Sequence, residues 1–344
     1  MTGPLLDVAD LTVRFPIRGG VLRRVVGHVT AVAGARLQIA RREAYGLVGE
    51  SGCGKTTLAR AVLGLVEPSE GTVSYAGEPV IGRARRAAFR RKVQAIFQDP
   101  FSSLNPRMTA GAIIAEPIRV HRLVPPGRLK ARVAELLGLC GLPGRFAELY
   151  PHEMSGGQRQ RVGIARALAL EPELLVCDEA VSALDVSVQA QIVNLLDGLR
   201  RDLGLTYLFI GHDLSVVRHL CGRVGVMYLG RIVETGPSDA VFARPQHPYT
   251  RALLDAVPAP DPETERAREI APLAGEVPSP SDPPSGCAFH PRCPVAVPRC
   301  RSARPELAPA GMGAAACWLA GPPEDHPSAA ADPHNQTQQQ ETQT

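Results

Sequence analysis

The stretch GESGCGKTT, residues 49–57, constrains the fold of this chain more than any other segment. It fits the pattern G-x-x-x-x-G-K-[ST], in which glycines let backbone N–H groups curl around a phosphate. The apolar run YGLV precedes it, and the helix-forming run LARAVLGL follows it. A strand, a glycine-rich turn and a helix in this order point the positive end of the helix at the same anion. The stretch therefore predicts a nucleoside-triphosphate site, and a chance glycine-rich turn is the weaker interpretation.

The loop itself is expected to hold the triphosphate. The Lys55 ammonium group can reach the outer phosphates, and the Thr56 hydroxyl can bind Mg²⁺. The residues predicted to bind the nucleotide are Gly49, Glu50, Ser51, Gly52, Cys53, Gly54, Lys55, Thr56 and Thr57.

The bulk composition excludes several other classes of protein. A net charge of +4 is small for 344 residues, so a dedicated nucleic-acid binder is not indicated. No run approaches the ~18 apolar residues that cross a bilayer. The N-terminus MTGPLLDVAD also lacks the basic-then-apolar order of a secretory signal. We therefore expect a cytoplasmic protein that reaches a membrane only through a partner.

The pattern of apolar residues changes along the chain in a way that predicts an α/β fold. Alternation over the first 40 residues indicates antiparallel strands. Helical stretches between prolines, at about residues 100–155, indicate an inserted helical subdomain. Compact apolar runs at 174–177, 206–210 and 224–229 then alternate with helices, one of them at 186–203. Such alternation predicts a parallel sheet covered by helices on both faces.

The C-terminal part of the chain has a different composition. Proline becomes frequent after about residue 255, and the last residues contain almost nothing apolar to bury. The sequence thus predicts a nucleotide-binding domain at 1–255, a small extension with four cysteines at 256–320 and a disordered tail at 321–344.

Two acidic residues supply the second half of the predicted site. Asp178 and Glu179 follow the apolar run LLVC directly. Asp178 is placed to hold Mg²⁺, and Glu179 to position the attacking water. Two acids after a strand can also cap the next helix, but a phosphate loop in the same chain favours the catalytic interpretation.

The segment MSGGQRQRVGIARAL, residues 154–168, offers a second anion-binding helix end. Because the chain already has a phosphate loop, a second one makes sense if it serves a nucleotide held by another subunit.

With these motifs the chain resembles the ABC ATPases. The family's glutamine loop is matched by Gln98, its D-loop by the segment 182–185 with Asp185, and its switch histidine by His212. Phe15 stands where the family more often has the tyrosine that stacks on adenine. Ala180 departs from the family, in which a proline usually follows the catalytic glutamate. The family's signature motif is matched by Ser155, Gly156, Gly157 and Gln158.

The resemblance narrows to one group, the ATP-binding subunits of oligopeptide, dipeptide and nickel importers. FQDPFSSLNPRMT, HPYTRALLDAVPAPDP and GCAFHPRCP look like segments of these subunits, and the resemblance covers about residues 5–318. It implies an ATP-hydrolysing subunit that energises a bacterial importer, with Glu179, His212 and Gln98 as catalytic residues. Mg²⁺ would then be held by Thr56, Gln98 and Asp178.

The same resemblance implies a set of partners. These are a second ABC ATPase subunit, identical or homologous, two transmembrane permease subunits and an extracytoplasmic solute-binding protein. The subunit would lie peripherally on the cytoplasmic face of the inner membrane. A mechanical ABC ATPase acting on DNA or ribosomes is disfavoured, because the chain has neither long coiled-coil insertions nor a second cassette. A P-loop kinase would not account for the SGGQ helix.

The eight cysteines fall into two groups. Cys53, Cys140, Cys177 and Cys221 are scattered and are expected to be small apolar residues, while Cys287, Cys293, Cys300 and Cys317 follow the pattern C-x5-C-x6-C-x16-C. Four thiolates can hold zinc or an iron–sulfur cluster, and the long gaps favour a cluster mildly. The resemblance implies a structural 4Fe–4S cluster, with zinc as the alternative and unliganded cysteines as a third possibility.

Overall fold

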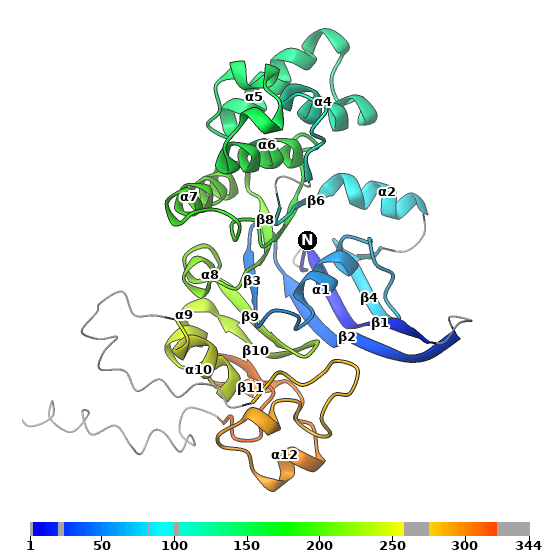
Figure 1. Ribbon diagram of the computed structural model, residues 1–344, viewed down its shortest axis with the longest axis vertical. Helices are drawn as coiled ribbons and strands as arrows, with labels where there is room; N and C mark the ends of the chain where they lie inside the picture. The colour runs from blue at the N-terminus through cyan, green and yellow to red at the C-terminus, as the bar shows by residue number, and fades with distance from the viewer. Residues whose placement is uncertain (1–2, 20–23, 81–82, 100–102, 258–274, 322–344) are drawn as a thin grey trace, which may run out of the picture. The chain divides into compact units, whose positions relative to one another are not determined.

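The computed structural model describes residues 3–19, 24–80, 83–99, 103–257 and 275–321 (Figure 1). The chain forms two compact units. Unit 1 comprises residues 1–232 and 278–283, and unit 2 comprises residues 233–277 and 284–344. Almost all of the tail that the sequence predicts to be disordered lies outside the described residues, as does most of the proline-rich segment before the cysteines.

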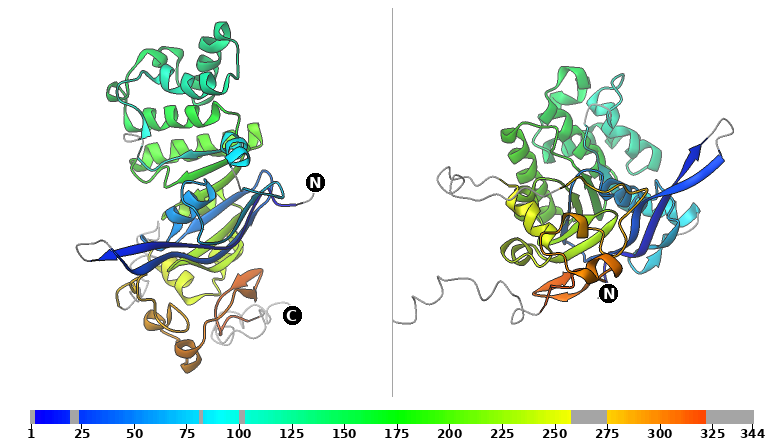
Figure 2. Two further views of the ribbon diagram at one scale, coloured as in Figure 1. Left: turned by 90° about the vertical axis from the view of Figure 1, so that its right-hand side faces the viewer. Right: turned by 60° about the horizontal axis from the view of Figure 1, so that its bottom comes forward.

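Unit 1 begins with a four-stranded antiparallel sheet, as the alternating pattern predicts. Its strand order is β2-β1-β4-β5. The long hairpin of β1 and β2 reaches beyond the rest of unit 1 (Figure 2). The strands are β1 (Leu6–Gly19), β2 (Arg24–Ile39), β4 (Glu70–Tyr75) and β5 (Glu78–Pro79).

A parallel sheet forms the centre of unit 1 and carries the nucleotide motifs. Within this unit the order is β9-β3-β8-β7-β6, and each of these neighbouring pairs is parallel. The central strands are buried on both faces, which explains their continuous apolar runs. The strands are β3 (Ala44–Val48), β6 (Val93–Ile96), β7 (Leu174–Asp178), β8 (Thr206–Ile210) and β9 (Arg223–Tyr228).

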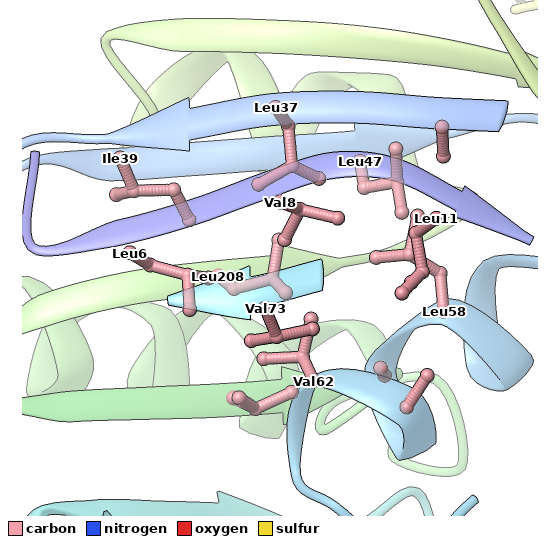
Figure 3. Close-up of a cluster of buried hydrophobic side chains, with 14 of the residues drawn as sticks. Leu6, Val8, Leu11, Leu37, Ile39, Leu47, Leu58, Val62, Val73 and Leu208 are labelled. Atoms are coloured by element: carbon pink, nitrogen blue, oxygen red, sulfur yellow. The ribbon is translucent and has the colours of Figure 1, made fainter. Parts of the chain in front are cut away.

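The main core of unit 1 joins the two sheets through helix α1 (Lys55–Val62). Leu58 and Val62 of α1 pack in one cluster with Leu11 of the antiparallel sheet and with Leu47 and Leu208 of the parallel sheet (Figure 3). Because α1 starts at the phosphate loop, this packing fixes the loop relative to both sheets.

The range predicted as a helical subdomain, about residues 100–155, contains α4 and α5, which contact each other and also α6, a helix beyond that range. Thr109 caps α4 by accepting a hydrogen bond from the Ala112 N–H. The α-helices are α2 (Arg83–Lys92), α4 (Ala110–His121), α5 (Leu129–Leu139), α6 (Gly156–Leu168), α7 (Val186–Leu203) and α8 (Leu214–Leu220). The short 3₁₀ helices are η1 (Pro126–Arg128), η2 (Gly144–Glu148) and η3 (Pro151–Glu153).

Unit 2 is built from short elements. Strand β10 (Arg231–Pro237) pairs with β12 (Gly313–Ala315), and β12 pairs with β11 (Ala308–Ala310). Its helices are α9 (Ser238–Ala243), α10 (Pro248–Asp255), η4 (His290–Arg292) and α12 (Pro298–Ser302). None of the helices in the described part of the chain is long and apolar enough to span a membrane.

Candidate functional site

The phosphate loop lies between β3 and α1, where the sequence predicts it. Its glycines are required by the backbone. Gly49 and Gly54 have φ values of 152° and 110°, which residues with a Cβ rarely adopt. A Cβ at Gly49 would also overlap the carbonyl oxygen of Met227, and a Cβ at Gly54 would overlap that of Ala31. The loop therefore depends on glycine at both positions.

Two side chains of α1 place a cation and a hydroxyl at this loop. Lys55 is 4% exposed, and its Nζ donates to the carbonyl oxygens of Gly49 at 2.8 Å and Glu50 at 3.0 Å. The Thr56 Oγ1 donates to Asp178 Oδ1 at 3.2 Å. Burial raises the pKa of the Asp178 carboxyl, and the neighbouring Glu179 charge acts in the same direction. A hydroxyl and a carboxylate from different elements thus converge, and oxygen ligands of this kind suit Mg²⁺.

Glu179 occupies a strained turn directly after β7. Its φ is 49°, in the left-handed region that costs a non-glycine residue about 1–3 kcal/mol. Its N–H donates to the Ile210 carbonyl at 2.9 Å, and its carbonyl accepts from the Ser182 N–H and hydroxyl. The Glu179 Oε2 lies 3.8 Å from Nδ1 of His212. The structure therefore brings the predicted water-positioning carboxylate and the predicted switch histidine together.

Two further residues lie beside this turn, and neither was predicted from the sequence. Gln189 of α7 donates from Nε2 to Asp213 Oδ2 at 2.9 Å, and Asp213 also caps α8. Both line one pocket with Glu179 and His212. Asp213 had a sequence signal, because an acid before an apolar helix is a typical N-cap. Gln189 had none.

For Gln98 and Phe15 the structure gives only a position and an exposure. Gln98 is exposed two residues beyond the end of β6, and β6 pairs in parallel with β7, so Gln98 follows the same edge of the sheet as Asp178. Phe15 lies in β1 opposite Val29, with 41% of its surface exposed. An exposed aromatic ring is available for stacking on a base. The roles of both residues stay predictions.

The signature segment forms the start of α6. Ser155 is the N-cap; its Oγ accepts from the Gln158 N–H at 3.3 Å, and Gln158 Oε1 accepts from the Ser155 N–H at 2.9 Å. This reciprocal capping box defines the helix end, which carries partial positive charge. Helices α6 and α1 lie apart in unit 1 (Figures 1 and 2). The signature and the phosphate loop of one chain therefore do not share a binding site.

The four C-terminal cysteines converge within unit 2. Cys287, Cys293, Cys300 and Cys317 line one small pocket together with His247 and Phe289. Burial raises the pKa of Cys287, Cys293 and Cys317, to about 11 for Cys293. Within the described ranges, however, no group of three or more His, Cys, Asp or Glu side chains is arranged to hold a metal ion.

The histidine and tyrosine of the HPY segment support this pocket. His247 caps α10 by accepting from the Tyr249 N–H at 3.1 Å, and burial lowers the pKa of His247 to about 4. Both rings pack on Phe289, which lies two residues after Cys287. The other four cysteines, in unit 1, are buried as small apolar residues, as expected.

Comparison with known proteins places this site in a family. Residues 32–182 match the family described as ABC transporter, and residues 233–300 match the family described as oligopeptide/dipeptide transporter, C-terminal region. In solved structures, a cbiO1 protein from Clostridium perfringens is 28% identical, with a TM-score of 0.61, over 70% of this chain and 92% of that one. A dimeric ATP-binding cassette bound to ADP and phosphate is 27% identical, with a TM-score of 0.60, over 68% and 98%.

Curated relatives are similar over nearly the whole chain. The probable peptide ABC transporter ATP-binding protein y4tS of Sinorhizobium fredii is 52% identical over 94% of this chain and 92% of its own length. The oligopeptide transport ATP-binding protein OppF of Escherichia coli is 52% identical over 88% and 92%. The chain therefore belongs to the ABC transporter ATP-binding subunits, in the group that carries the oligopeptide/dipeptide transporter C-terminal region.

Proposed function

We propose that this subunit hydrolyses ATP to drive the import of oligopeptides, dipeptides or a related small solute. The observation that carries the catalytic assignment is the convergence of Thr56, Asp178, Glu179 and His212 at the ends of parallel strands. The names of the relatives, which are peptide transport proteins, support the choice of solute.

In the proposed reaction each residue has one task. Glu179 orients the attacking water, and Lys55 offsets charge on the outer phosphates. Thr56 and Asp178 would hold the metal ion, with Gln98 as a further ligand. Bound Mg²⁺ would supply positive charge against the negative charge of the phosphates. His212, next to Glu179, contacts the γ-phosphate, and Phe15 stacks on the adenine.

The active form is proposed to be a pair of ATPase subunits. The signature segment Ser155–Gln158 lies apart from the phosphate loop of its own chain, and it suits a phosphate held by a second subunit. The dimeric cassette in the solved structures supports this arrangement. Closure of the pair on ATP would move two permease subunits, and an extracytoplasmic protein would deliver the solute. The subunit would bind these permeases at the cytoplasmic face of the inner membrane.

The chemical assignment can be tested by Glu179→Gln. We expect ATP binding to be retained and turnover to be lost, because an amide cannot position water as a carboxylate does. Lys55→Ala should instead weaken ATP binding itself, because it removes the cation from the loop. ATP affinity and phosphate release should be measured on the full-length chain. Glu171→Gln makes the same change on the exposed loop before β7 and should leave turnover intact. Turnover of Glu179→Gln near the wild-type rate would contradict its proposed role.

We also propose that Cys287, Cys293, Cys300 and Cys317 hold a structural 4Fe–4S cluster. The donor set fits, because four cysteines are the usual ligands of such a cluster. The four cysteines line one pocket of unit 2, and the gaps between them in the sequence are longer than those usual between paired zinc ligands.

Purification without oxygen tests this second proposal. Protein with a cluster should be brown, bleach on reduction and contain four irons and four sulfides per chain. Cys300→Ser should lose the iron, whereas Cys221→Ser, which alters a buried cysteine of unit 1, should keep it. Colourless protein with stoichiometric zinc would support the alternative ion. Metal-free protein with normal transport would exclude both.

A further inference from the structure

The side chain of Gln160 is buried in α6, although glutamine is usually exposed. The residue is 2% exposed, and its Nε2 donates to the Ala180 carbonyl oxygen at 2.6 Å. Burying an amide is costly unless it is hydrogen-bonded, so this bond fixes both the side chain and the peptide that it contacts. Ala180 directly follows Glu179. Gln160 therefore binds the turn that carries the proposed water-positioning carboxylate.

The turn needs such support because its conformation is strained. A left-handed residue other than glycine persists only where its surroundings hold it. The Ile210 carbonyl holds the Glu179 N–H, and Ser182 holds the Glu179 carbonyl. Gln160 holds the next carbonyl along the chain. Alanine at position 180 lacks the ring with which a proline would restrict the backbone. The hydrogen bonds from Glu179 to Ile210, from Ser182 and from Gln160 restrict the backbone of this turn instead.

The same helix also packs on the segment that follows the turn. A Cβ at Gly157 would overlap Cγ1 of Val188, and a Cβ at Gly156 would lie 3.3 Å from Leu184. The first turn of α6 is therefore in close contact with the loop and helix that begin after Glu179. Contacts at Ala180, Leu184 and Val188 join α6 to this segment, and Arg161 of α6 donates a further hydrogen bond to Gln191 at 3.5 Å.

We infer that Gln160 is a positioning residue that couples the signature helix to the catalytic turn of its own chain. The N-terminus of α6 would sense a nucleotide held by the second subunit, and Gln160 would transmit its position to Glu179. Each site would then be competent only when the other is occupied. This inference rests on the proposed function, because it needs Glu179 to position water and Ser155 to face a second nucleotide.

The first test is Gln160→Met, which keeps the length of the side chain and removes the donor. The full-length chain should be assayed together with the subunits that co-purify with it. We expect kcat to fall by about 10- to 100-fold, because small displacements of a catalytic group have effects of that order. KM and ATP affinity should stay within twofold of wild type. Gln38→Met makes the same change at an exposed position of β2 and should leave kcat unchanged.

The second test is Gln160→Glu. In this variant the side chain at position 160 can donate a hydrogen bond to the Ala180 carbonyl oxygen only when it is protonated, so the bond depends on pH. An ionised carboxylate cannot donate to the Ala180 carbonyl, whereas a protonated one can. Burial raises the pKa of a carboxyl group, so this variant should be protonated in mildly acidic solution. Its kcat relative to wild type should therefore rise about tenfold between pH 8.5 and pH 6, while that of Gln160→Met stays flat. A residue with a merely structural role would not give this profile.

The outcomes separate this inference from the proposed function. Normal kcat in Gln160→Met, or a pH-independent loss in Gln160→Glu, would overturn the inference. If Gln160→Met does not fold, the pH profile of Gln160→Glu alone decides. Glu179→Gln is assayed in parallel. If it turns over ATP normally, the proposed function is wrong; if it is inactive while both Gln160 variants are normal, only the coupling is wrong.

Discussion

Glu173, directly before β7, joins three segments that are distant in sequence. Its carboxylate accepts from Arg41 at 2.7 Å and forms an ion pair with Lys92 at 3.0 Å. Partial burial would by itself raise the pKa of Glu173, but the hydrogen bonds from Arg41 and Lys92 outweigh it and lower the pKa to about 2. The ionised carboxylate therefore stabilises the edge of the parallel sheet that leads to Asp178.

We expect Glu173→Gln to lower the free energy of unfolding at pH 7 by about 1 kcal/mol, a value reduced for solvent screening because the side chain is one-third exposed. The folded pKa lies below the ordinary value of 4.5. The contribution is therefore complete above pH 4.5 and is lost as the pH falls toward 2. Denaturant titrations of both proteins at pH 7, 5 and 3.5 should show the difference shrinking only at the lowest pH. A difference that does not change with pH would contradict this account, and Glu306→Gln, at an exposed position, serves as the control.

Elements with a strong local signal could be predicted from the sequence. Helix α7 begins after its N-cap Asp185 and ends before Gly204, which has a left-handed backbone conformation, so its bounds match the predicted range 186–203. The strands β7, β8 and β9 were recognisable because burial on both faces requires continuous apolar runs. Each of these signals lies within a few residues of the element that it specifies.

What depends on packing between distant segments could not be predicted. Glutamine in a helix is normally exposed, and nothing near Gln160 indicates that its amide points at Ala180. The elements of unit 2 are three to eight residues long, too short for a periodic pattern, so the pairing of β10 with β12 had no signal. The packing of the His247 and Tyr249 rings on Phe289 could not be predicted either, although the HPY segment could be recognised by its resemblance to a known family.

At the scale of the whole molecule, the phosphate loop and the segment proposed to serve a second nucleotide occupy separate places on one chain. The phosphate loop precedes α1, and the signature segment begins α6. The exposed Ser155 at the start of α6 is available to a second subunit. The proposed pair would therefore bury two nucleotides by symmetry, whether the partner is a copy or a homologue.

This arrangement predicts that Ser155→Arg blocks ATP-driven association. The substitution places bulk and a cation where the partner's γ-phosphate would lie. ATP affinity of the single subunit should stay within about threefold of wild type, since its own phosphate loop is unchanged. Size-exclusion chromatography with ATP, in a Glu179→Gln background that prevents turnover, should show only monomer. Ser302→Arg at the end of α12 is the matched control and should still associate. Loss of ATP binding by the monomer would contradict the two-subunit site.

The close packing of Gly157 on Val188 has a consequence for genetics. Gly157 belongs to the segment that would face the partner's nucleotide, but any larger side chain there would overlap Val188 of its own chain. A transport-defective allele at this codon would therefore reduce the amount of protein in the cell, because misfolded subunits are degraded. An allele at the codon for exposed Ser155 would leave that amount unchanged. Immunoblots of the two classes of allele would separate a folding defect from a defect in energy coupling, although both strains fail to grow on the transported solute.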